Sequence, residues 1–178
     1  MSETKRADPR ESLREFQSRL AEKLKVAETT GGTRSKLGIL AGGHLWLVNL
    51  DQVNEVVTVP RLTSAPWTKP WFAGVASVRG VIHGCVDLAA FAGVAEPMPR
   101  GESRLLLAHP RFGVNVALRV ERALGLRPLA ELVEEPLARD SATQPWLVTR
   151  WRDQQGELWT EISVEQLVSQ PAFLEAGL

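Results

Sequence analysis

The chain is nearly devoid of cysteine and has no tyrosine. Its one cysteine, Cys85, cannot form an internal disulfide. Because Cys85 stands in an apolar run, we expect a buried thiol that behaves as a small hydrophobic side chain. The three histidines, His44, His83 and His109, share no metal-ligand spacing with one another or with Cys85. We therefore expect neither a zinc site nor any other cofactor.

The chain also lacks an excess of charge of either sign. Lysine plus arginine and aspartate plus glutamate number 21 each, so no global field attracts nucleic acid or anionic lipid. No apolar run approaches about 18 residues, and the charged N-terminus from Glu3 to Arg14 has no apolar signal region. These absences predict a soluble, cytoplasmic protein that does not insert into a membrane.

Motifs of catalysis are missing too. Gly31-Gly32 and Gly42-Gly43 lack the lysine and serine or threonine that a phosphate-binding loop needs. There is no nucleophile elbow, and no serine stands in a context that suggests activation by a histidine. The acidic pair Glu134-Glu135 precedes Pro136, which favours a solvated loop. We therefore expect no catalytic residues and a protein without enzymatic activity.

A duplicated block is the strongest positive feature. Pro70-Trp71-Phe72 leads to Gly80 and then Val86-Asp87-Leu88, and a second copy runs from Pro145-Trp146 through Gly156 to Ile162-Ser163-Val164. The segments that precede the blocks are also alike, Trp46–Leu50 with Phe112–Val116 and Val53–Val59 with Val120–Leu126. Apolar and turn residues are shared while polar residues differ, which is typical of a repeated unit that shares its core.

The N-terminal segment has a different pattern. Asp8-Pro9 reads as a helix start, and apolar residues follow at helical spacing up to Ala27, before Gly31-Gly32. The amphipathic helix would either dock on its own domain or bind a partner. We predict a helical extension at 1–33 and a β domain at 34–178.

The rest of the chain consists of short apolar runs broken by glycine, proline, asparagine and aspartate. This pattern favours small antiparallel barrels, and the duplication suggests two packed barrels of about five strands each. The tail Val164–Ala176 is predicted to be a short helix interrupted near Pro171. Hairpin turns are predicted at Gly42-Gly43 and Asp153–Gly156, and short helical turns at Asp51–Val53 and Arg119–Arg122. The candidate strands are Lys36–Ala41, His44–Leu50, Glu55–Val59, Val75–Val78, Val81–Leu88, Leu105–His109, Phe112–Leu118, Ala123–Pro128, Trp146–Trp151 and Leu158–Ile162.

Six tryptophans raise the alternative of a small barrel that binds single-stranded nucleic acid by stacking bases on aromatic rings. Trp67, Trp71 and Trp146 lie beside prolines at equivalent joints, which favours packing anchors. Basic and acidic residues are interleaved, so the basic groove that this function needs is missing.

Arg79-Gly80 separates two apolar strands, where glycine permits a tight turn and arginine projects from a rigid scaffold. Arg79 would either close the turn onto a carbonyl or a carboxylate such as Asp87, or dock on a partner while that carboxylate holds it. Asp87 could also cap a helical turn at Leu88–Phe91.

These residues resemble the CheW family of chemotaxis coupling proteins. The family pattern is matched by Val53-Asn54-Glu55-Val56, by Pro60 and Pro66, and by the run from Gly74-Val75 through Arg79-Gly80 to Val86-Asp87-Leu88. The similarity spans Leu37 to Val168. Within the family, Pro70-Trp71-Phe72, His83-Gly84 and Leu13–Phe16 are similar to the PilI group, the coupling proteins of twitching motility.

The resemblance implies two SH3-like five-stranded barrels and a scaffold without enzymatic activity. It further implies an adaptor that joins the regulatory domain of a histidine kinase to the cytoplasmic tip of a chemoreceptor, controlling type IV pilus twitching motility. By the same resemblance, Val53, Glu55 and Gly74 would face the kinase. Arg79, supported by Asp87, would face the receptor.

Overall fold

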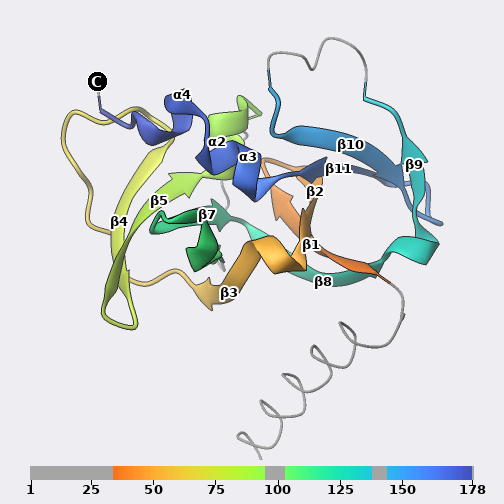
Figure 1. Ribbon diagram of the computed structural model, residues 1–178, viewed down its shortest axis with the longest axis horizontal. Coiled ribbons are helices and arrows are strands. Elements are labelled where there is room, and N and C mark those ends of the chain that lie inside the picture. Colours follow the sequence, from red (N-terminus) through yellow and green to blue (C-terminus); the bar gives the residue numbers. More distant parts are fainter. Residues whose placement is uncertain (1–33, 95–102, 138–143, 178) are drawn as a thin grey trace, which may run out of the picture. The chain divides into compact units, whose positions relative to one another are not determined.

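The computed structural model describes residues 34–94, 103–137 and 144–177 (Figure 1). The predicted helix between Asp8 and Ala27, and with it the extension at 1–33, lies outside the described residues. None of the helices in the described ranges is long and apolar enough to cross a membrane.

Strands dominate the described chain, as the short apolar runs predicted. Short helical segments punctuate them at Leu50–Gln52 (η1), Leu88–Ala92 (α2), Pro110–Phe112 (η2), Leu129–Glu131 (η3), Val164–Val168 (α3) and Pro171–Leu174 (α4). The strands are β1 Ser35–Ala41, β2 His44–Asn49, β3 Val53–Thr58, β4 Phe72–Val78, β5 Val81–Asp87, β6 Arg104–Ala108, β7 Val116–Val120, β8 Arg122–Pro128, β9 Val133–Glu135, β10 Leu147–Arg152 and β11 Leu158–Ile162.

The strands form two sheets that lie side by side (Figure 1). Sheet A has six strands in the order β8-β1-β2-β11-β10-β9, and sheet B has five in the order β3-β6-β7-β5-β4. Neither sheet closes on itself through strand pairing within the described ranges. Two β units are present as predicted, but the closed five-stranded barrels are not confirmed, and sheet A carries a sixth strand.

The two copies of the duplicated block are the hairpins β4–β5 and β10–β11, each followed by a short helix. The hairpins are exchanged between the copies. The β10–β11 hairpin joins β1 and β2 through the parallel pair β11–β2, and the β4–β5 hairpin joins β6 and β7 through the parallel pair β5–β7. Each sheet therefore combines strands from both copies.

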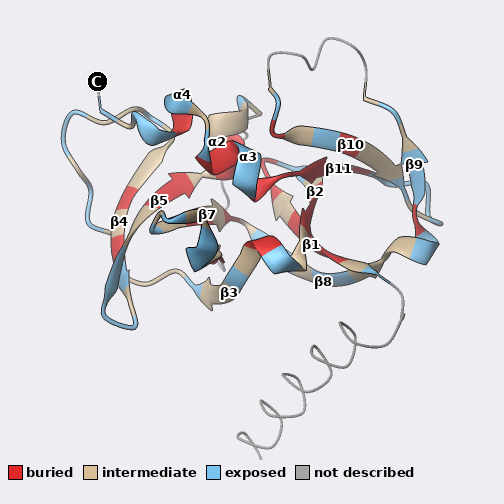
Figure 2. Ribbon diagram, in the orientation of Figure 1, coloured by how far each residue is buried: buried red, intermediate tan, exposed pale blue. Residues whose placement is uncertain are grey.

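Alternation along the strands divides the core into three clusters. In β6, Leu105 and Leu107 point into the cluster of sheet B, while Leu106 points into a central cluster shared by both sheets. In β2, Leu47 belongs to the cluster of sheet A and Trp46 to the central one. This period of two is that of a strand with both faces buried. The red segments in Figure 2 gather where the two sheets meet.

Several local predictions hold and others are wrong. The turns at Gly42-Gly43 and Asp153–Gly156 and the interrupted helical tail are confirmed. The strand predicted from Phe112 begins only at Val116, because Pro110 starts a 3-10 turn that Gly113 ends with φ 70°. The helical turn predicted at Arg119–Arg122 is wrong, since these residues extend β7 and begin β8.

The predicted loop at Glu134-Glu135 is also wrong. Both residues lie in β9, which pairs antiparallel with β10 at the edge of sheet A. The Glu135 carboxylate accepts two hydrogen bonds from the Arg152 guanidinium, which fastens this short strand to its neighbour.

Candidate partner-binding surface

The tip of the β4–β5 hairpin is exposed from Arg79 to Ile82. Arg79 and Gly80 form a two-residue turn in which both backbones are left-handed, with φ 51° and 82°. This conformation suits the twist of a hairpin, and glycine adopts it freely while arginine is strained there. Next to the turn, Val81 and Ile82 leave 44% and 59% of their surface exposed. The tip thus presents a guanidinium beside two apolar side chains.

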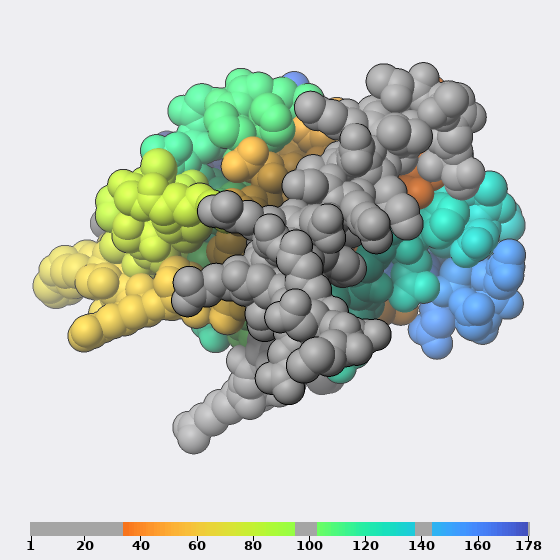
Figure 3. Space-filling view, turned by 90° about the horizontal axis from the view of Figure 1, so that it is seen from below, coloured from red at the N-terminus to blue at the C-terminus, as the bar shows by residue number. Residues whose placement is uncertain are grey.

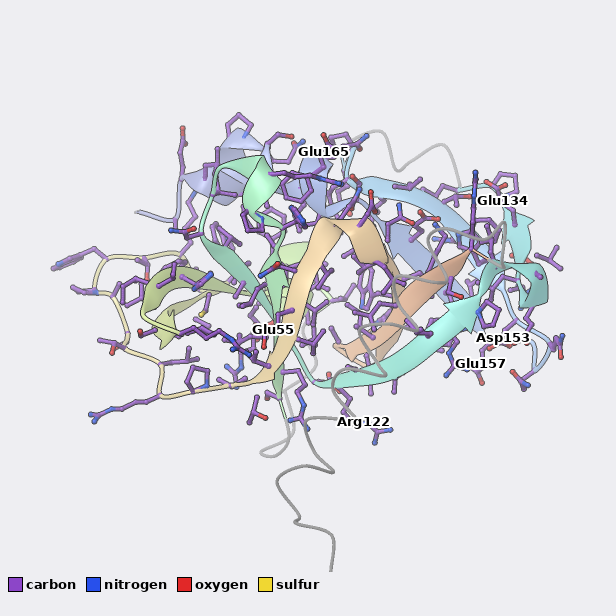
Figure 4. All side chains as sticks on the ribbon, turned by 60° about the horizontal axis from the view of Figure 1, so that its bottom comes forward. Glu55, Arg122, Glu134, Asp153, Glu157 and Glu165 are labelled. Atoms are coloured by element: carbon purple, nitrogen blue, oxygen red, sulfur yellow. The ribbon has the colours of Figure 1, made fainter. Side chains whose placement is uncertain are left out.

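Arg79 makes a two-point ion pair with Glu55 of β3. Its Nε donates to Oε2 at 3.0 Å and its Nη2 donates to Oε1 at 2.6 Å. The hydrogen bond to Glu55, and then the negative charge of Glu55, raise the pKa of the Arg79 guanidinium. The pair links the tip of the hairpin to β3, an edge strand of the same sheet, on which Figure 4 labels Glu55. The arginine side chain is 76% exposed, so the pair remains open to a partner.

Asp87 does not contact Arg79, and the predicted pairing of these two residues is wrong. Its Oδ1 accepts a hydrogen bond from the N–H of Ala90 at 3.0 Å, so Asp87 caps α2, as the alternative prediction held. The equivalent residue of the second copy, Ser163, caps α3 in the same way through the N–H of Gln166. Both copies therefore place a capping residue where the strand ends.

Val53 and Glu55 lie close together at the start of β3. The pairing of β3 with β6 shifts register between them, which is a β-bulge. Val53 is half-buried and packs against the central cluster, while Glu55 reaches Arg79. The bulge thus directs an apolar contact inward and a charge toward the hairpin.

Gly74 is buried and packs against its own chain. Its φ is 121°, and a Cβ built there would lie 2.4 Å from the carbonyl oxygen of Thr63. Thr63 and Val75 exchange two backbone hydrogen bonds of 2.8 Å at this point. The glycine is required by a close approach between β4 and the loop segment at Thr63, which gives it a role within the fold.

The structure therefore brings Glu55 and Arg79 into contact, with Val53 on the strand of Glu55 and Gly74 on the strand that leads to Arg79. Asp87 lies at the opposite end of β5. The sequence pattern did not predict that Val81 and Ile82 are exposed, because apolar residues in a strand are usually assigned to the hydrophobic core.

Trp67 was predicted to be a packing anchor with Trp71 and Trp146, and for Trp67 this is wrong. It is 82% exposed with φ 59°, on the loop that stands out in yellow in Figure 3. Trp71 and Trp146 do pack, each against the ring of Phe91.

Groups suited to metal binding are not assembled in the described ranges. No group of three or more histidine, cysteine, aspartate or glutamate side chains there could hold a metal ion. Cys85 is fully buried, as predicted, and burial raises the pKa of its thiol to about 11. A thiol in that state is a poor nucleophile and a poor metal ligand.

A solved structure shares this fold. The crystal structure of scaffolding protein TtCheW from Thermoanaerobacter tengcongensis aligns with a TM-score of 0.66 and 18% sequence identity, over 78% of this chain and 94% of that chain. Protein PilI of Pseudomonas aeruginosa is 28% identical over 162 residues, which are 90% of this chain and 89% of PilI. The CheW-like domain model matches residues 37–172, more than two thirds of the sequence. The chain belongs to the CheW-like domain family.

Proposed function

We propose that this protein is a non-enzymatic adaptor that couples the cytoplasmic tip of a chemoreceptor to the regulatory domain of a histidine kinase. Membership of the CheW-like family and similarity to PilI support a cytoplasmic role in chemotaxis-type signalling that controls type IV pilus twitching motility. In this role Glu55 makes the kinase-facing contact, while Val53 and Gly74 act beneath it by holding the strands that carry this side of the surface. Arg79 faces the receptor, and Asp87, which caps α2, supports the other end of the same hairpin.

The observation that carries the proposal is the ion pair between Glu55 and Arg79. It joins the residue proposed to face the kinase to the one proposed to face the receptor, over 24 positions in sequence. Adaptor function needs both partners to bind one rigid body, so that a shift in one biases the other. A direct contact between the two groups supplies such a connection.

The chemistry of the pair also suggests how coupling works. An acidic group on the receptor tip that binds the exposed Arg79 competes with Glu55 for the same guanidinium. Glu55, once released, changes the charge that β3 presents to the kinase domain. Val81 and Ile82 beside the turn add apolar contact area to the receptor side.

Charge exchange across the pair tests this proposal. Arg79→Glu should weaken binding to the receptor tip about tenfold, and Glu55→Arg should weaken binding to the kinase regulatory domain by a similar factor. The double variant restores an ion pair with both charges reversed. It should therefore regain the stability of the hairpin while binding to both partners stays weak, as measured by calorimetric titration and urea unfolding.

Arg152→Glu is the matched control, because Arg152 makes the equivalent two-point ion pair with Glu135 in sheet A. It should leave both affinities unchanged. If the double variant binds both partners as tightly as the wild type does, the pair serves only the fold. If Arg79→Glu, Glu55→Arg and the double variant all bind the receptor tip and the kinase domain with wild-type affinity, the proposed surface is refuted.

A further inference from the structure

An aromatic cavity of about 290 Å³ opens at the junction of the two copies, away from the hairpin tip. It is lined by the two equivalent tryptophans of the duplicated block, Trp71 and Trp146, and by Phe91 of α2. Lys69, Gln144, Gln170 and Ala172 complete the lining, from the loop before β4, the segment before β10, the N-cap of α4, and α4 itself. The helices α2 and α4 lie together in this region of Figure 1.

The aromatic walls are held in place by ring contacts. Phe91 meets the edge of Trp71 at a centroid distance of 5.2 Å and lies 5.9 Å from Trp146. The other side of Trp71 stacks on Phe173, a buried ring of α4, at 6.1 Å and 11°. Such fixed rings make a preformed cavity, which binds a flat apolar group without first ordering its own walls.

Two indole donors at the cavity have no acceptor among the described residues. Trp46, Trp151 and Trp159 each donate their indole N–H to a protein oxygen. Neither Trp71 nor Trp146 does so within the described part of the chain, although buried or half-buried indoles usually find an acceptor.

Lys69 adds a cation to this set. It forms no ion pair with any described residue, and no carboxylate lines the cavity. The set thus consists of two indole N–H groups, a lysine and the carboxamides of Gln144 and Gln170, the latter already donating to the Gln166 carbonyl. With a cation, unpaired indole donors and no carboxylate, the cavity favours an anion over a cation.

We propose that this cavity binds a small aromatic carboxylate. The ring would lie among Trp71, Phe91 and Trp146, and the carboxylate would face Lys69. A volume of about 290 Å³ stands at the lower limit of ligand pockets, which run from about 300 to 1,000 Å³, so the ligand has one ring system. None of the residues that line the cavity belongs to the surface proposed for the kinase and the receptor.

Indole N–H resonances in ¹⁵N-labelled full-length protein give a site-specific test with phenylacetate as the probe. Phenylacetate should shift the Trp71 and Trp146 signals saturably and leave those of Trp67, Trp151 and Trp159 in place. Phenethylamine, which carries the opposite charge, should bind at least about fivefold more weakly, because a part-exposed ion pair is lost. Cyclohexylacetate, which has no π system, should also bind more weakly.

Two variants separate the cavity from non-specific binding. Lys69→Glu should reverse the preference between phenylacetate and phenethylamine, while Arg61→Glu, a charge reversal in the same loop at an exposed position, should not. Ala172→Phe on the exposed side of α4 should fill the cavity and abolish the shifts without unfolding the protein.

The proposal is overturned if phenylacetate leaves Trp71 and Trp146 unshifted, or if both probes bind equally well. It is also overturned if a blocked Glu-Phe dipeptide binds while phenylacetate does not, because the cavity would then receive a side chain of a partner protein.

Discussion

Gly74→Ala should destabilise the protein by about 3 kcal/mol. A non-glycine residue at φ 121° carries strain of about 1 kcal/mol or more. The new Cβ would also lie 2.4 Å from the Thr63 oxygen and 3.0 Å from its carbon, both backbone atoms that no rotamer change can move. If the Thr63 segment withdraws, its two hydrogen bonds with Val75 are lost, at about 1 kcal/mol each. Urea unfolding measures the sum: with a slope of about 2 kcal/mol per molar, the midpoint should fall by about 1.5 M.

Gly80→Ala is the matched control for this prediction. Gly80 also has a positive φ, 82°, but nothing lies within 4 Å of the position that its Cβ would take. Alanine there should therefore show the strain alone, about 1 kcal/mol. If Gly74→Ala destabilises no more than Gly80→Ala does, with equal slopes, the close approach at Thr63 has no energetic weight and the role assigned to Gly74 is wrong.

Three further predictions concern capping, burial and charge. Asp87→Ala and Ser163→Ala should each lower the free energy of unfolding by about 1 kcal/mol, measured in urea, because each removes the N-cap of a short helix. Cys85 should resist a thiol-specific reagent at pH 8 until the protein unfolds, since the thiol is buried and its pKa is raised to about 11; prompt labelling of native protein would contradict this. Lys36→Met should destabilise by about 3–5 kcal/mol because it strands the buried Glu161 carboxylate, and adding Glu161→Gln should restore most of the loss.

Apolar periodicity was sufficient to find the strands whose faces are buried. Leu158–Ile162 forms β11 with the predicted bounds, since the turn at Asp153–Gly156 precedes it and the capping residue Ser163 follows it. The same reasoning failed for β9, where two glutamates and a following proline resemble a loop. Its strand conformation comes from pairing with β10 and from the ion pair between Glu135 and Arg152, neither of which a local pattern contains.

The candidate surface was located by motif, but its central contact was not predicted. Asp87 is eight positions from Arg79 and invited a pairing. The hairpin register sets Val78 opposite Val81 and Phe72 opposite Val86, so Asp87 lies at the far end from the turn. Glu55 reaches Arg79 because sheet B brings its first strand near the tip of this hairpin. Local spacing cannot reveal a contact that depends on how a whole sheet curves.

The exchange of hairpins between the copies has a related cause. Both hairpins present the same alternation of apolar residues, so pattern alone allows either one to complete either sheet. Which hairpin completes which sheet is decided where the chain crosses from one sheet to the other, after β2 and after β7. At the first crossing the buried Gln52 side chain accepts a hydrogen bond from the N–H of Val164, and at the second the Glu121 carboxylate accepts one from Gly42. Each crossing is thus fastened by a polar side chain to a distant segment of the chain. The two copies share apolar residues but not these polar ones. The repeat in the sequence therefore reveals the β unit, but it does not reveal that the two copies exchange their hairpins.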